Sequence, residues 1–247
     1  MLKKIKKTYI VTGSSTGIGE ATATKLYNLG NNVILASRNL KINKKIFKNK
    51  SKYIAFNGNL FDPIFVKDFI KTAYNKFGRI DGLFNIAGSS SDTKIEKITL
   101  DEWHRIINDN LTSTFLCSKF VIPYLKKNSS KGVIINTSSV AGRNKSLIAG
   151  VHYTSSKAAI IGFTKQLAFE LSKFSIRVNC VAPGQTDTKM LRSAVKKNKI
   201  NINNLKKNIP LGRIASPEEI ANVMIFLSSD DSSYLTGSVI DINGGVI

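Results

Sequence analysis

The stretch from Thr8 to Gly19, TYIVTGSSTGIG, decides the fold. Its first five residues are apolar or β-branched and predict a buried strand, and a helical pattern begins at residue 17. Three glycines spaced G-x-x-x-G-x-G lie at the junction, where the backbone must turn tightly and let a pyrophosphate approach a helix N-terminus. We therefore predict a dinucleotide-binding turn whose contacts come from Gly13, Ser15, Thr16, Gly17, Ile18 and Gly19.

The rest of the chain alternates short β-branched runs with longer helical patterns, which is typical of a doubly wound parallel sheet. Strands are predicted at residues 8–12, 32–37, 53–57, 82–85, 132–138, 176–181 and 238–242. Helices are predicted at residues 17–29, 62–77, 99–127, 152–173 and 216–228, and a further helix at 40–48 is left open. We expect an α/β fold, a single Rossmann-type domain over residues 1–247 with about seven parallel strands and helices on both faces. A small substrate lid is expected around residues 188–209.

The composition argues against several other classes of protein. With 247 residues, 42% of them hydrophobic, the chain can bury one large core. It lacks an apolar run of the roughly 20 residues that span a bilayer, and the apolar run after its basic start stops at Thr12, too early for a secretion signal. Cys117 and Cys180 have apolar neighbours, so we expect reduced core thiols rather than a disulfide or a metal site. A soluble, cytoplasmic, metal-free protein is expected.

The net charge of +21 raises nucleic acid or another anion as a partner. One interpretation is a solvated basic exterior, because Lys, Asn and Ile are abundant along the whole chain. The other depends on location, since lysines cluster within residues 41–52 and 196–207, beside two predicted ligand regions. No helix-turn-helix, zinc-ligand spacing or aromatic-basic RNA motif is present, so nucleic acid is not expected to be the partner.

Residues 36–39, ASRN, follow the glycines by about 20 positions, where the adenosine ribose of a dinucleotide is expected. An acidic residue there would accept a hydrogen bond from the 2′-hydroxyl of NAD, whereas a basic residue would meet the 2′-phosphate of NADP. No carboxylate is present, and Arg38, next to Ser37, can offer a planar guanidinium fork. The sequence favours NADP(H) over NAD(H).

Tyr153 and Lys157 are spaced i and i+4 on a predicted helix, which places both side chains on one face. Reduction of a ketone leaves negative charge on oxygen and needs a proton donor beside it. The ordinary pKa of tyrosine is about 10, and a nearby ammonium would lower it. About one Tyr-x-x-x-Lys is expected by chance in a chain so rich in lysine, so the surrounding segments must decide whether this pair is catalytic.

The segments that decide are residues 12–19, 85–88, 108–112, 132–142, 152–157 and 179–188. In order along the chain they resemble the short-chain dehydrogenase/reductase family, whose patterns are TGxxxGxG and YxxxK. The nearest resemblance is to 3-oxoacyl-(acyl-carrier-protein) reductase-like members. It implies four catalytic residues. Ser139 would orient the substrate oxygen, Tyr153 would exchange its proton, and Lys157 would bind the nicotinamide ribose and lower the pKa of the tyrosine. Asn110 would complete a water-linked proton relay to Lys157.

The same resemblance implies further cofactor contacts. Two family positions are changed, because Asn59 stands for the usual Asp and Ile86 for the second Asn of an NNAG turn. The segment after the sixth predicted strand resembles the one that holds the nicotinamide carboxamide, with Thr188 as the matching side chain. Implied contacts beyond the glycine turn and residues 37 and 38 are Asn59, Leu60, Asn85, Ala87, Gly88, Tyr153, Lys157, Pro183, Gly184, Thr186 and Thr188.

We expect an enzyme that interconverts a ketone and a secondary alcohol. One interpretation of the basic lid is a substrate with an acidic handle, such as an acyl-carrier-protein thioester, a coenzyme A thioester or a phosphorylated sugar. The other is a solvated lysine-rich helix. Alternatives are a sugar, polyol or other small-alcohol dehydrogenase of the same family, and, in another class, a non-catalytic protein that senses dinucleotides or binds nucleic acid. The predicted helix over residues 152–173 is apolar on more than one face, which favours a homodimer or homotetramer.

Overall fold

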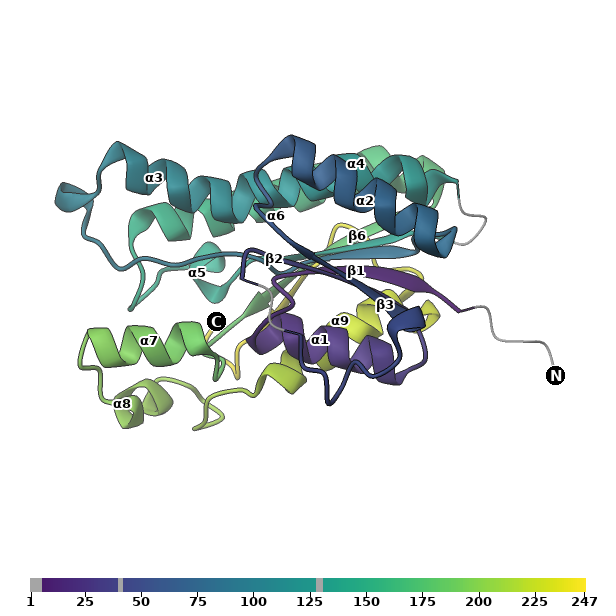
Figure 1. Ribbon diagram of the computed structural model, residues 1–247. Coiled ribbons are helices and arrows are strands. Elements are labelled where there is room, and N and C mark those ends of the chain that lie inside the picture. The colour runs from purple at the N-terminus through teal and green to yellow at the C-terminus, as the bar shows by residue number, and fades with distance from the viewer. Residues whose placement is uncertain (1–5, 40–41, 128–130) are drawn as a thin grey trace.

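A computed structural model describes residues 6–39, 42–127 and 131–247 (Figure 1). Within these ranges a 7-stranded parallel sheet has the order β3-β2-β1-β4-β5-β6-β7, which confirms the predicted fold class. The first four strands have the predicted bounds, and the last three differ by one or two residues at their ends. The strands are β1 Thr8–Thr12, β2 Asn32–Ser37, β3 Tyr53–Asn57, β4 Gly82–Asn85, β5 Val133–Thr137, β6 Arg177–Pro183 and β7 Val239–Ile242.

The five predicted helices agree with the structure within two residues at their outer ends, and α5, α7 and α8 were not predicted as helices. The helices are α1 Gly17–Asn28, α2 Pro63–Phe77, α3 Leu100–Ile107, α4 Ser113–Lys126, α5 Val140–Arg143, α6 Val151–Leu171, α7 Lys189–Lys197, α8 Ile202–Lys207 and α9 Pro217–Ser228. The predicted helix at 99–127 is interrupted by a π-helical turn, Asn108–Thr112. Residues 42–48 form turns rather than a helix, and residues 40 and 41 lie outside the described ranges.

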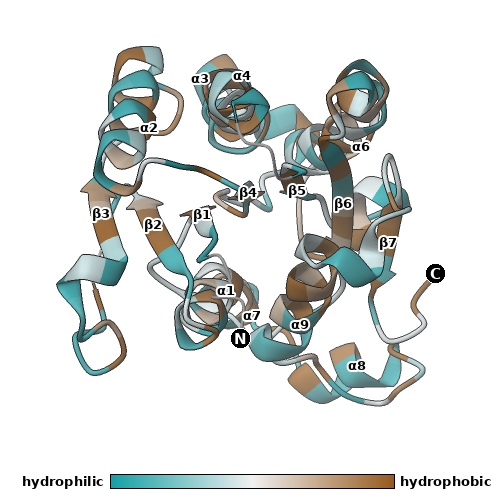
Figure 2. Ribbon diagram, turned by 90° about the vertical axis from the view of Figure 1, so that its right-hand side faces the viewer, coloured by the Kyte–Doolittle hydropathy of each residue, from teal (hydrophilic) through white to brown (hydrophobic). Residues whose placement is uncertain are grey.

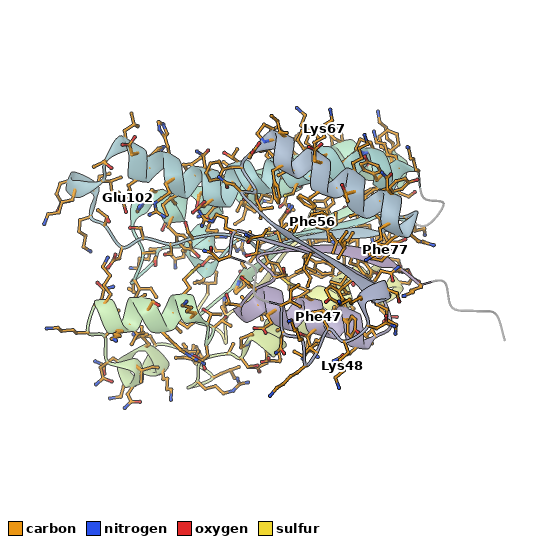
Figure 3. The ribbon with its side chains drawn as sticks, in the orientation of Figure 1. Phe47, Lys48, Phe56, Lys67, Phe77 and Glu102 are labelled. Carbon is orange, nitrogen blue, oxygen red and sulfur yellow. The ribbon has the colours of Figure 1, made fainter. Side chains whose placement is uncertain are left out.

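Helices cover both faces of the sheet (Figure 2). Because neighbouring residues of a strand point to opposite faces, Ile10 packs in the layer under α2, α4 and α6, and Val11 packs in the layer against α1 and α9. Figure 3 shows Phe56 and Phe47 on opposite sides of the sheet, where Phe56 meets Phe69 of α2 with ring centroids 5.5 Å apart. Both faces are therefore apolar, as expected of a parallel sheet.

Part of the basic charge lies on the exterior. Lys48, in the first lysine cluster, and Lys67 of α2 are exposed and project away from the ribbon in Figure 3. Lys41, which belongs to the same cluster, lies outside the described residues. For these two lysines the structure agrees with the interpretation of a solvated basic surface.

The strand order reverses between β1 and β4, because the chain runs outward from β1 to β3 and then returns to pair β4 with β1. In open parallel sheets, ligands bind beyond the carboxyl ends of the strands at such a reversal. Helices α5, α7 and α8 lie at the end of the sheet opposite the N-terminus (Figure 1). Among the described residues, no helix combines the length and the apolar character needed to cross a membrane.

Candidate active site

A cavity of about 540 Å³ lies at the carboxyl ends of the strands. All but two of the residues predicted for the site, Asn85 and Asn110, line it. The lining residues from that set are Gly13, Ser15, Thr16, Gly17, Ile18, Gly19, Ser37, Arg38, Asn59, Leu60, Ala87, Gly88, Ser139, Tyr153, Lys157, Pro183, Gly184, Thr186 and Thr188. The fold therefore brings residues from six strand ends to one cavity.

The glycine turn depends on missing side chains. Gly13 and Gly17 have φ angles of 67° and 57°, in the left-handed region that favours glycine. A Cβ on Gly19 would lie 2.2 Å from the carbonyl oxygen of Gly13, so the helix could not pack against the turn. The α1 N-terminus thereby reaches the cavity, and the Thr16 side chain makes no capping hydrogen bond there. The first backbone N–H groups of α1 are therefore available to an anion.

Ser139 and Tyr153 meet in the wall of the cavity. Ser139 follows β5 and caps α5, where its hydroxyl accepts a hydrogen bond from the Ala141 N–H at 3.1 Å. Its side chain also lies close enough to Tyr153, in the first turn of α6, to lower the pKa of that phenol. Ser138 is turned away, donating to the carbonyl oxygen of Lys157 at 2.7 Å. Of the two adjacent serines, Ser139 is the one beside the tyrosine.

Lys157 lies one helical turn beyond Tyr153 and is buried. Its Nζ donates to the carbonyl oxygen of Thr137 at 2.9 Å and lies 5.8 Å from the centroid of the Tyr153 ring. Burial lowers the pKa of Lys157 from 10.5 to about 8. The ammonium is therefore held in a desolvated place at the cavity wall, where it loses its proton more readily than an exposed lysine.

The pKa of Tyr153 shifts in the direction opposite to the prediction. Burial raises it above the ordinary value of 10, and the hydrogen bond with Ser139 offsets only part of this increase. The expected lowering by Lys157 is not seen: the pKa of Tyr153 is set by desolvation of the phenolate and by Ser139, while the Lys157 ammonium donates to the backbone at Thr137. At neutral pH Tyr153 carries its proton, which is the form that can donate to a carbonyl oxygen.

Asn110 lies in the π-helical turn and is fully buried. Its Nδ2 donates to the Ser156 hydroxyl at 2.8 Å and to the Ser89 carbonyl oxygen at 3.1 Å, and its Oδ1 accepts from the Ser89 N–H at 2.8 Å. A Cβ on Gly88 would lie 2.6 Å from this Oδ1 and 3.5 Å from the Nζ of Lys157. The amide thus clamps the loop after β4 beside the lysine, and its part in a proton relay stays a prediction.

Asn85 does not line the cavity, where a cofactor contact was predicted for it, and its side chain bonds to neighbouring elements instead. Its Nδ2 donates to the Ser118 hydroxyl at 3.1 Å and to the Asn136 Oδ1 at 2.9 Å. Asn136 in turn donates to the Thr164 hydroxyl at 3.0 Å. A polar side chain at the buried end of a strand must find partners inside the protein, so the Asn85 amide joins β4 to its neighbours rather than facing the cavity.

Arg38 presents its predicted guanidinium fork, but to a carboxylate of this chain. Its Nη1 and Nη2 lie 2.9 and 3.1 Å from the two oxygens of Asp109. Asp109 was not predicted as a site residue, although it directly precedes Asn110 in the sequence. Sequence spacing could not show this pair, because the two residues are 71 positions apart.

The segment predicted as the lid forms α7 and α8. Both contribute apolar side chains to the cavity, among them Met190, Leu191 and Leu205. Two of its cations are paired, Arg192 with Asp187 at 2.6 Å and Lys197 with Asp92 at 2.5 Å. Lining residues outside this segment that were not predicted for the site are Asn39, Phe61, Ile86, Ser90, Asp109, Ser113, Thr137, Ser138, Val140, Ala141, residues 144–149, Gln185, Val246 and Ile247.

These features fit a nicotinamide dinucleotide. The N-terminus of α1 suits the pyrophosphate, and the buried Lys157 ammonium lies where it could bind ribose hydroxyls beside the tyrosine. The hydroxyl-bearing residues Ser139 and Tyr153 line the same cavity. Fold and site define a Rossmann-type oxidoreductase that uses a nicotinamide dinucleotide.

The chain belongs to the short-chain dehydrogenase/reductase family. A family model described as enoyl-(acyl carrier protein) reductase matches residues 13–247. The chain is 37% identical over 249 residues to a 3-oxoacyl-(acyl-carrier-protein) reductase of Thermotoga maritima, with 98% of each chain covered. It is 39% identical over 245 residues to the enzyme of the same name from Aquifex aeolicus, with 97% of each covered.

Two solved structures agree with this assignment. The ligand-free aldohexose dehydrogenase of Thermoplasma acidophilum superposes with a TM-score of 0.88 at 33% identity, covering 98% of this chain and 94% of that one. A short-chain type dehydrogenase/reductase from Mycobacterium marinum has a TM-score of 0.90 at 31% identity, with 97% and 95% covered. The chain is thus an NAD(P)-dependent oxidoreductase, and the alternative of a non-catalytic dinucleotide or nucleic-acid binder is not supported.

Proposed function

We propose that this protein is an NADP(H)-dependent reductase of 3-oxoacyl thioesters. The observation that carries the proposal is that Ser139, Tyr153 and the buried Lys157 line one cavity, which a basic segment borders. Two donors directed at one oxygen suit the reduction of a carbonyl group. The 3-oxoacyl reductases among the relatives support the thioester as the class of substrate.

In this mechanism the bound dinucleotide supplies the hydride. Ser139 holds the substrate carbonyl oxygen, and Tyr153, protonated at neutral pH, donates its proton to that oxygen as negative charge develops. The Lys157 ammonium stabilises the resulting phenolate and binds the ribose. Asn110 fixes the loop after β4 against α6 through Ser89 and Ser156, which keeps the cavity wall in place.

The lid is proposed to attract the acidic carrier of the substrate. Lys189, Lys196, Lys199 and Lys207 are exposed on or between α7 and α8, whereas Arg192 and Lys197 are engaged by carboxylates. Exposed lysines at the mouth of a cavity create a positive potential that favours a phosphorylated or acidic carrier. The apolar inner side of the lid, with Met190 and Leu205, would contact the acyl chain.

The test is NADPH oxidation with one 3-oxoacyl group carried on acyl-carrier protein, on coenzyme A and on a small neutral thiol. We expect kcat/KM to be highest for the acidic carriers and to fall as salt is raised, because exposed charges are screened. The neutral thioester should show little dependence on salt. Equal kcat/KM and equal salt response for all three carriers would contradict a functional role for the basic lid.

An aldohexose dehydrogenase is the second candidate, favoured by the structural similarity to the Thermoplasma enzyme. It predicts NAD(P)-dependent oxidation of free sugars and no activity on the thioesters. An enoyl thioester should be included as a third substrate, since the matching family model has that description. Turnover of the sugar or of the enoyl thioester alone would replace the proposed substrate.

The preference for NADP(H) is tested by Arg38→Asp. Replacing the cation by a carboxylate puts negative charge where the 2′-phosphate is expected, so kcat/KM for NADPH should fall by about 100-fold. The value for NADH, which has a 2′-hydroxyl, should change by less than about threefold. Lys48→Asp, an equal change of charge on an exposed lysine, is the control. An unchanged ratio of kcat/KM for NADPH to kcat/KM for NADH would contradict the proposed preference for NADP(H).

A homodimer or homotetramer is proposed from the outer face of α6. The Phe169 side chain is 78% exposed there, and Phe115 of α4 is also exposed. Large exposed aromatic residues are typical of subunit contacts. Sedimentation of the wild-type chain and of Phe169→Glu measures the association directly, and we expect the variant to associate less.

A further inference from the structure

Asp109 is a carboxylate buried in the wall of the cavity, with only 3% of its side chain exposed. It lies in the π-helical turn Asn108–Thr112, and Arg38 reaches it from the loop that follows β2. The two terminal nitrogens of the guanidinium face the two carboxylate oxygens at 2.9 and 3.1 Å. This end-on, two-point geometry fixes the plane of the guanidinium as well as its position.

Two other groups hold the Asp109 carboxylate in place. The Ser89 hydroxyl donates to Oδ2 at 2.6 Å, and the Nη1 of Arg105 lies 3.9 Å from the same oxygen. A buried carboxylate is costly unless it is paired and hydrogen-bonded, and here both conditions are met. The acceptor for Arg38 is therefore a rigid one.

The contact with Asp109 leaves part of the guanidinium free. An arginine side chain has five N–H donors, and the end-on contact engages one on each terminal nitrogen. Among the described residues, the Nε–H and the outer hydrogens of Nη1 and Nη2 have no partner and remain for another anion. The Arg38 side chain is 49% exposed and lines the cavity beside Ser37 and Asn39, at the strand end where the adenosine ribose is expected. Asp109 and a 2′-phosphate can thus engage one guanidinium together.

We propose that Asp109 is the positioning residue that makes Arg38 selective for the 2′-phosphate. A free arginine must lose the freedom of its long side chain when it binds an anion, and that cost lowers affinity. Asp109 removes the cost in advance by holding the fork across the ribose site. The unusual consequence is that removing a negative charge from a phosphate site weakens phosphate binding. This inference rests on the proposed preference for NADP(H).

The experiment compares binding of adenosine 2′,5′-bisphosphate and adenosine 5′-monophosphate by calorimetry, which needs neither turnover nor hydride transfer. Asp109→Asn keeps the shape of the side chain and removes its charge. We expect the affinity for the bisphosphate to fall about 10-fold and that for the monophosphate by less than twofold. Asp68→Asn is the matched control, because it removes a carboxylate charge from an exposed position on α2 and leaves the Arg38 contact, and both affinities should stay unchanged.

A second variant keeps the inference testable if Asp109→Asn does not fold. Arg38→Lys retains the positive charge but offers a single ammonium, which cannot engage both carboxylate oxygens and an additional anion in one plane. The same selective loss of bisphosphate affinity is expected. Unchanged or tighter bisphosphate binding in either variant would overturn the proposal, and so would an equal loss for both nucleotides, which would indicate only a structural role.

The inference can fail separately from the function on which it rests. Arg38→Gln measures the proposed NADP(H) preference alone, through loss of the guanidinium. If Arg38→Gln weakens bisphosphate binding but Asp109→Asn does not, the preference stands and the role of Asp109 is refuted. If Arg38→Gln has no effect, both are refuted, while reduction of 3-oxoacyl thioesters is decided independently by the turnover assays.

Discussion

Tyr153→Phe is expected to lower kcat for carbonyl reduction by about 10³-fold while leaving dinucleotide affinity within about twofold of the wild type. The change removes one hydroxyl, the proposed proton donor, and keeps the ring. Tyr153 forms part of the cavity wall and its hydroxyl meets Ser139, so the loss falls on the step in which the carbonyl oxygen gains its proton. Steady-state NADPH oxidation gives kcat, and fluorescence titration gives the affinity for NADPH.

Tyr124→Phe is the matched control for this variant. Tyr124 lies in α4, where its ring packs against Tyr74 with centroids 4.7 Å apart, outside the cavity. The same removal of a hydroxyl there should leave kcat unchanged. A Tyr153→Phe enzyme that keeps more than about a tenth of the wild-type kcat would exclude Tyr153 as the acid.

Lys157→Met is expected to cost about 10³-fold in kcat/KM and also to weaken dinucleotide binding. Methionine fills similar space, but it cannot stabilise a phenolate or donate to ribose hydroxyls. Because burial lowers the pKa of Lys157 to about 8, wild-type kcat/KM for reduction should decline above that pH as the ammonium is lost. The variant should lack this decline. Lys165→Met, on the exposed side of the same helix, is the control.

Lys157→Met should also be more stable than the wild type at neutral pH. The pKa of Lys157 is about 8 in the folded chain and 10.5 in the unfolded chain. Below about pH 8 the lysine is charged in both states, so the full cost of burying the charge destabilises the fold. As pH rises from about 8 towards 10.5 the folded chain releases the proton first, so the penalty fades. Lys157→Met should therefore raise the free energy of unfolding at pH 7 by up to about 3 kcal/mol, less the loss of the Thr137 hydrogen bond. Urea unfolding at pH 7 and pH 10 measures both values.

An activity loss without a gain in stability at pH 7 would show that the hydrogen bond outweighs the burial penalty. A wild-type profile flat through pH 9 would contradict the assigned role of the Lys157 ammonium. Together the two variants separate the proton donor from the group that supports it, because Tyr153→Phe leaves binding intact and Lys157→Met does not.

Much of the fold was predictable because its signals are local. The bounds of β1 to β4 follow from short β-branched runs that end at glycine or polar residues. The capping box at Ser216 and Glu219, with Pro217 between them, similarly set the start of α9. The π-helical turn at Asn108–Thr112 was missed, since one extra residue in a helix leaves almost no trace in its periodicity.

Most of the predicted site residues line one cavity, but their environment was not predictable from the sequence. The sequence by itself determined the parallel sheet, the glycine turn and the shared helix face of Tyr153 and Lys157, because glycine geometry and helical spacing act over a few residues. The full set with Asn110 and Ser139 came from the family resemblance and stays a prediction. Only the tertiary structure decided that Arg38 meets Asp109 across 71 positions and that Val246 and Ile247 reach the cavity. It also decided that the pKa of Tyr153 rises instead of falling. These properties depend on desolvation and on contacts between distant segments, which arise only when the chain packs.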